Sequence, residues 1–65
     1  MYEVVVYDEK KVYSLDKYEL LNRAKAAARY AWSILTAEEK KNRRVEVRKY
    51  TNSSRNYWDV FEWKE

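Results

Sequence analysis

Few residues of this sequence could carry out catalysis, and each has a simpler structural explanation. The chain has no histidine and no cysteine, so the most common general base and the best thiol nucleophile are absent. Its four serines therefore lack a histidine that could activate them. The carboxylate pairs Asp8–Glu9 and Glu38–Glu39 fall in an expected turn and an expected helix cap. We expect no catalytic residues and no enzymatic activity.

The composition also gives no sign of a metal, a cofactor or a small-molecule substrate. Zinc sites are built mainly from cysteine and histidine, and this chain has neither. The sequence also contains no glycine, which the phosphate-binding loops of nucleotide enzymes require. We expect no metal-binding and no cofactor-binding residues.

Basic residues concentrate in the middle of the chain, where they could contact phosphate groups. Residues 23–55 carry ten lysines and arginines against three acids, whereas the two flanking segments are mildly acidic. A nucleic-acid-binding protein is therefore the alternative hypothesis for function, although several acids lie in the same region. The candidate phosphate contacts are Lys40, Lys41, Arg43, Arg44, Lys49 and Arg55.

The elements that would position these residues follow from hydrophobic periodicity and capping signals. Residues 2–7 predict a strand, and residues 8–11 a polar turn. Asp16 and Glu19 form a capping-box pattern, which predicts that a helix begins there and continues to about residue 35. A second capping pattern at Thr36 and Glu39 predicts a short helical turn.

The last third of the chain predicts a hairpin. Residues 44–50 and 57–63 alternate as strands around a turn at 51–56. Together these elements predict a single α+β domain over residues 1–65 with β-α-β-β order. One long amphipathic helix packs on one face of a three-stranded, mainly antiparallel sheet, with the last strand in the centre. Whether Val12–Tyr13 forms an extra strand stays open.

The sheet face that the helix leaves uncovered is the candidate interface. An unusually aromatic set faces outward if the residues that face the helix are Val4, Val6, Val45, Val47, Trp58 and Val60. The last strand could also face the other way, with Phe61 and Trp63 inward. The candidate interface residues are Tyr7, Arg48, Tyr50, Tyr57, Phe61 and Trp63.

Three explanations fit such a face. Cross-strand aromatic and charged pairs stabilise small sheets by themselves. Tyrosine, tryptophan and arginine are also enriched at protein interfaces, and open-sheet aromatics stack nucleic-acid bases. We favour a small binding module that acts through protein–protein contacts, either as a homodimer or with another protein. A phage-type inhibitor of a host factor would be one such module.

One resemblance bears on origin. Residues 31–41 (AWSILTAEEKK), followed by a Val-x-Val strand and the ending Asp-Val-Phe-Glu-Trp, resemble short uncharacterised proteins of Gram-positive bacteria, their phages and mobile elements. The similar part spans residues 14–63 and implies the same fold and a bacterial or phage origin. It implies no site residues, because that class has no established activity.

The expected compartment is the cytoplasm. The chain has no apolar run of about 18 residues that could span a membrane. Its first residues lack the basic start of a signal peptide, and the absence of cysteine agrees with a reducing compartment.

Overall fold

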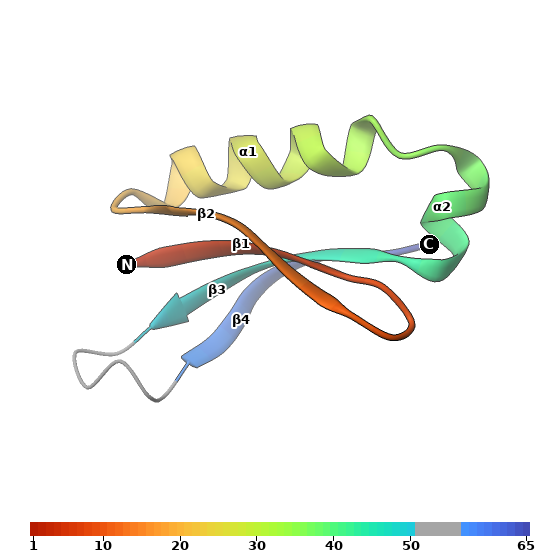
Figure 1. The fold of residues 1–65 in the computed structure, drawn as a ribbon. Helices are drawn as coiled ribbons and strands as arrows, with labels where there is room; N and C mark the ends of the chain where they lie inside the picture. The colour runs from red at the N-terminus through yellow and green to blue at the C-terminus, as the bar shows by residue number, and fades with distance from the viewer. Residues whose placement is uncertain (51–56) are drawn as a thin grey trace.

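A computed structural model places one long helix across one face of a four-stranded antiparallel sheet, with a short helix at one end (Figure 1). The structure describes residues 1–50 and 57–65, so the expected turn at 51–56 lies outside the described residues. The α+β class is confirmed. The elements in chain order are β1 (Tyr2–Tyr7), β2 (Val12–Tyr18), α1 (Leu21–Ser33), α2 (Ala37–Asn42), β3 (Arg44–Tyr50) and β4 (Tyr57–Trp63).

Strand β2 occupies residues that were expected to begin the helix. It pairs with β1 along its whole length, from Tyr2 opposite Tyr18 to Tyr7 opposite Val12. The predicted capping box was wrong: the carboxylate of Asp16 accepts a hydrogen bond from the next backbone N–H, and α1 begins after Leu20 without a side-chain cap. A helix cap is worth about 1 kcal/mol, which a full ladder of backbone and cross-strand contacts outweighs.

The additional strand changes the topology that was predicted. The sheet order is β2-β1-β3-β4, and every neighbouring pair is antiparallel. Because β2 reverses the chain before the helix, α1 returns the chain so that β3 runs parallel to β2, with β1 between them. The last strand therefore lies at an edge, and the prediction of a three-stranded sheet with that strand in the centre was wrong.

The core lies between α1 and the two central strands. Ala24 and Ala28 of the helix are fully buried against Val4, Val45 and Val47. Alanine at these positions lets the helix backbone come close to the sheet, so valine side chains fill the space between the layers. The predicted inward orientation of Val4, Val6, Val45 and Val47 is confirmed.

The short helix α2 begins as its sequence predicted. The Thr36 hydroxyl accepts a hydrogen bond from the Glu39 N–H, and the Glu39 carboxylate accepts one from the Thr36 N–H. Arg43, just beyond α2, forms an ion pair of 2.7 Å with Glu39. No described helix is long and apolar enough to cross a membrane.

Candidate functional site

The uncovered side of the sheet, hereafter the open face, is defined by the strand registers. Its centre is buried although no element covers it: Glu3, Val5 and Glu46 are 7%, 1% and 2% exposed. Long side chains from neighbouring strands lie over these three residues and exclude water from them. The described residues of the open face are Glu3, Val5, Tyr7, Val12, Ser14, Lys17, Arg44, Glu46, Arg48, Tyr50, Tyr57, Asp59 and Glu62.

Two arginines and two tyrosines form a stack across β1, β3 and β4. The Arg48 guanidinium carbon lies 5.0 Å from the Tyr7 ring centroid and 4.3 Å from that of Tyr57. The Arg44 guanidinium carbon also lies over the Tyr7 ring, 4.2 Å from its centroid. Asp59 of β4 adds an ion pair to Arg48 at 3.7 Å. Aromatic rings attract guanidinium groups electrostatically, so these contacts hold the side chains in fixed positions.

Glu3 connects three strands beneath this stack. Its carboxylate accepts hydrogen bonds from the hydroxyls of Ser14 on β2 and Tyr50 on β3. Burial alone would raise the pKa of Glu3, but these two hydrogen bonds and the charges of Lys17 and Arg48 lower it overall. Glu3 therefore remains ionised and acts as a structural acceptor.

The pKa of Glu46 is raised, whereas that of Glu3 is lowered. Burial and the neighbouring Asp59 carboxylate raise the pKa of Glu46, despite a hydrogen bond of 2.9 Å from the Arg44 Nε. Its second carboxylate oxygen is buried and has no hydrogen-bond partner among the described residues. A proton on Glu46 would give that oxygen a donor to share with Asp59.

The structure separates the six candidate interface residues into two groups. Tyr7, Arg48, Tyr50 and Tyr57 lie on the open face, where the Tyr50 and Tyr57 ring centroids are 5.6 Å apart. The other two, Phe61 and Trp63, lie on the helix side.

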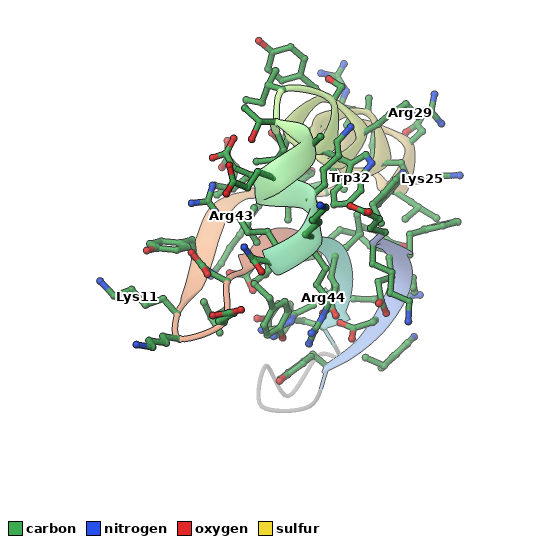
Figure 2. All side chains as sticks on the ribbon, turned by 90° about the vertical axis from the view of Figure 1, so that its right-hand side faces the viewer. Lys11, Lys25, Arg29, Trp32, Arg43 and Arg44 are labelled. Atoms are coloured by element: carbon green, nitrogen blue, oxygen red, sulfur yellow. The ribbon has the colours of Figure 1, made fainter. Side chains whose placement is uncertain are left out.

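An extra residue in β4 explains this placement. Val47 pairs with Phe61 but Arg48 pairs with Asp59, so Val60 has no partner of its own. This bulge lets both proposed inward pairs face the helix. Trp63 and Val60 pack on the core, while Trp58 lies opposite Lys49. Lys25 reaches from α1 toward β4, where its ammonium lies 4.0 Å from the Phe61 ring centroid (Figure 2).

Three aromatic side chains of edge strand β4 remain accessible on both sides of the sheet. Tyr57 is 48% exposed on the open face, while Trp58 and Phe61 are 47% and 36% exposed on the helix side. Other exposed apolar residues, such as Tyr13 and Leu15, lie on the opposite edge strand. The sequence analysis left Val12–Tyr13 open as a possible strand and placed Leu15 just before the helix, whereas both belong to β2.

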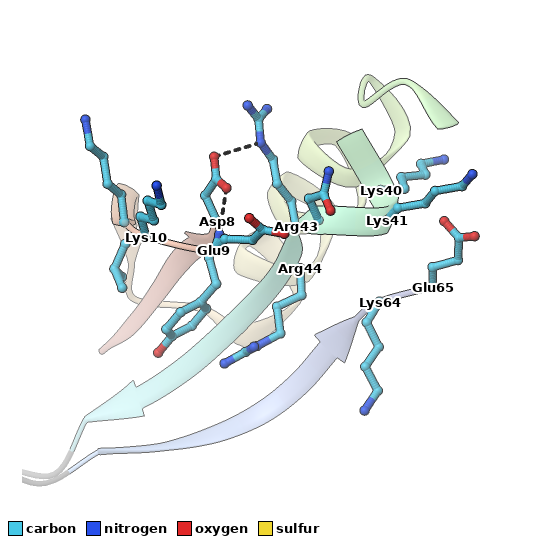
Figure 3. Close-up of a pocket in the computed structure, with 13 residues that line it drawn as sticks. Asp8, Glu9, Lys10, Lys40, Lys41, Arg43, Arg44, Lys64 and Glu65 are labelled. Carbon is cyan, nitrogen blue, oxygen red and sulfur yellow. Dashed lines mark hydrogen bonds and ion pairs between the residues drawn. The ribbon is translucent and has the colours of Figure 1, made fainter. Parts of the chain in front are cut away.

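The candidate phosphate contacts are only partly brought together. Lys40, Lys41, Arg43 and Arg44 line a hollow of about 610 Å³ between the β1–β2 turn, the end of α2 and the end of β4 (Figure 3). Lys49 lies elsewhere, over the Tyr2 and Trp58 rings, and Arg55 is outside the described residues.

Three lysines of the hollow were not predicted to belong to it. Lys10 and Lys11 come from the β1–β2 turn, and Lys64 follows β4. Lys64 lies there because β4 pairs with β3, as the predicted hairpin implies, whereas the place of Lys10 and Lys11 depends on the unexpected strand β2. The acids that line the same hollow are Asp8, Glu9 and Glu65.

Comparison with known protein families, curated proteins and solved structures found no match. Inference about function therefore rests on the chemistry of these surfaces.

Two serines among the described residues form hydrogen bonds within the fold. Ser14 donates to Glu3, and Ser33 donates to the Tyr30 carbonyl at 2.7 Å. No cluster of three or more acidic residues within residues 1–50 and 57–65 could hold a metal ion.

Proposed function

We propose that this chain is a small non-enzymatic binding module that takes a protein partner along edge strand β4 and the adjoining open face. The observation that carries the proposal is the exposure of Tyr57, Trp58 and Phe61 on both sides of one edge strand. Tyrosine and tryptophan are the residues that most often anchor protein interfaces. A partner that wraps this edge would bury all three aromatic rings together.

The backbone of β4 supports the same conclusion. As the outermost strand, β4 has a free edge of N–H and carbonyl groups that can pair with a strand from a partner. The other edge strand, β2, has lysines at and beside it, which discourage such pairing. We therefore place the partner's strand against β4.

The Tyr–Arg stack supports specificity at this surface. Arg48 has a side chain that is only 11% exposed, and it is held between the rings of Tyr7 and Tyr57. A side chain that is already immobile loses little conformational entropy when a partner binds. The stack therefore offers a rigid, amphipathic surface beside the exposed β4 aromatics.

The charges of the open face favour a protein over a nucleic acid there. Its described residues include the three bases Lys17, Arg44 and Arg48. Against them stand four acids, Glu3, Glu46, Asp59 and Glu62. A phosphate backbone would be repelled by this excess of acids, whereas protein interfaces commonly contain both signs of charge.

The test compares partner binding by face variants and by a matched control. Tyr57→Ala removes an anchor on the open face, and Trp58→Ala removes one on the helix side. Tyr30→Ala serves as the control, because this tyrosine is 68% exposed and lies on α1. Quantitative co-purification and light scattering over a concentration series would measure binding to other proteins and self-association.

We expect the Tyr57 and Trp58 variants to lose a complex, or a dimer, that the wild type and the Tyr30 variant both retain. Thermal denaturation would confirm that all variants remain folded. A strictly monomeric wild type whose co-purifying proteins are unchanged in both β4 variants would refute the proposal.

A further inference from the structure

The hollow at the end of the sheet concentrates the positive charge of the chain. Its lining has seven lysines and arginines and three acids, which gives a net charge of +4. The whole chain carries +3, so all other residues together have a net charge of −1. Cations from three separate segments of the sequence meet at this one place, and their fields add.

The arginines and lysines of the hollow have different roles. Arg43 pairs with Asp8 at 3.4 Å and with Glu39, and Arg44 is bonded to Glu46. Within the described residues, Lys10, Lys11 and Lys41 form no ion pair. Figure 3 shows Lys10, Lys41 and Lys64 extending away from the middle of the hollow, where Asp8 and Arg43 lie. Lys64 pairs with Glu62 at 3.5 Å, so the charges available to a ligand are the rim lysines Lys10, Lys11, Lys40 and Lys41.

This arrangement suits an extended polyanion better than a single compact anion. Lysine binds phosphate as a mobile point charge, without the fixed two-point geometry of arginine. Lys40 and Lys41 extend to one side of the hollow and Lys10 lies on the other (Figure 3), so one small anion could reach only one side, whereas a chain of phosphates could span both.

We propose that this hollow binds the phosphate backbone of a nucleic acid without reading its base sequence. Tyr7 is the only aromatic side chain in the described lining, and Arg44 covers its ring. Bases would find no free ring on which to stack, so binding depends on phosphate contacts alone. The site is separate from the β4 aromatics and does not depend on a protein partner.

The proposal gives a quantitative salt dependence. If Lys10, Lys11, Lys40 and Lys41 each neutralise one phosphate, log K against log salt has a slope of about −3.6 for duplex DNA. Affinity would then fall about 150-fold between roughly 50 and 200 mM salt. Removing two of the four lysines would reduce the slope to about −1.8.

The experiment measures binding of the full chain to a short fluorescent duplex over a series of salt concentrations. Two charge-neutralising variants are compared: Lys10→Gln with Lys11→Gln, and Lys40→Gln with Lys41→Gln. Although the two pairs lie far apart in the sequence, we expect both to reduce the slope by the same amount.

The matched control removes the same charge from α1. Arg23→Gln with Arg29→Gln changes two exposed arginines that form no ion pair in the described part of the chain. We expect the control to leave the slope unchanged, and we expect a poly-glutamate peptide to bind far more weakly than the duplex.

Three results would each overturn the proposal. One is no duplex binding at about 50 mM salt. Another is an equal loss in the α1 control, which would show a response to net charge alone. The third is equally tight binding of poly-glutamate, which would assign the site to an acidic protein segment instead of phosphate. None of these results bears on partner binding at β4, so the two proposals fail independently.

Discussion

Removing one hydroxyl beneath the open face should weaken the fold in a pH-dependent manner. The Tyr50 hydroxyl donates a hydrogen bond to the carboxylate of Glu3, which is only 7% exposed. A hydrogen bond to a charged group contributes about 1.5–3 kcal/mol. Ser14 still donates to the other carboxylate oxygen in a Tyr50→Phe variant, so we expect the lower end of that range. The variant should lose about 1.5 kcal/mol of unfolding free energy at neutral pH.

The pH dependence follows from the lowered pKa of Glu3. A carboxyl group whose pKa is lower in the folded state stabilises the fold above its ordinary pKa of about 4.3. That contribution is lost as the pH falls through the lowered folded-state value. Once Glu3 is protonated, the Tyr50 hydrogen bond is neutral and worth about 0.5–1.5 kcal/mol. The penalty of Tyr50→Phe should therefore shrink in acid.

Urea denaturation followed by tryptophan fluorescence at about pH 7 and about pH 3 measures both penalties. The midpoint should shift while the m-value stays constant, because the surface exposed on unfolding is unchanged. Tyr30→Phe is the control, because its ring is 68% exposed. A penalty that is absent at neutral pH, or that does not shrink at any acid pH at which the protein still folds, would show that the Glu3 charge does not organise the three strands.

Four further substitutions test other parts of the fold by the same denaturation assay. Thr36→Ala should cost about 1 kcal/mol because it removes a formed cap, whereas Asp16→Ala should change stability by less than about 0.5 kcal/mol. Glu46→Gln should stabilise the protein at neutral pH. Because the pKa of Glu46 is raised in the folded state, the contribution of this carboxyl group to the free energy of unfolding falls as the pH rises above its ordinary pKa. A loss of stability at pH 7 would contradict this. Ala28→Leu should cost about 1–3 kcal/mol by forcing α1 away from the sheet, and a neutral effect would refute the close approach.

The residues that the sequence placed correctly are those whose local and long-range preferences agree. Thr36 and Glu39 form a capping box both in the sequence pattern and in the structure. The alanines at 24 and 28 are small residues on the apolar side of a helix, and they are also where the sheet comes closest. Where a local signal and the tertiary environment favour the same structure, sequence alone is sufficient.

The start of the helix shows the opposite case. Asp16 and Glu19 have the spacing of a capping box, but residues 12–18 form a strand that pairs with β1, with a register shift at Leu15 that breaks the alternation between the two faces. Pairing with β1 decides between these two conformations, and no local pattern reports that pairing. The orientation of β4 was unpredictable for a related reason. The bulge at Val60 shifts the alternation by one residue, and without glycine or proline nothing in the sequence marks it.

The basic hollow could not be predicted because it depends on that same unexpected strand. When β2 pairs with β1, the turn between them carries Lys10 and Lys11 to the end of α2. The sequence pattern showed the basic segment after residue 39 but not the second source of charge. It also could not show which cations were already paired.

The ion pair between Arg44 and Glu46 determines how the protein-binding surface at β4 and the basic hollow relate to each other. Arg44 belongs to both, because it lines the hollow and also stacks on Tyr7 at the open face. A phosphate that drew Arg44 away would leave the buried Glu46 carboxylate without its base, and an unpaired buried charge is costly. The lysines at the rim carry no such penalty, so a polyanion can bind there while the Tyr–Arg stack remains intact. A protein partner at β4 and a nucleic acid at the hollow are therefore compatible on the same molecule.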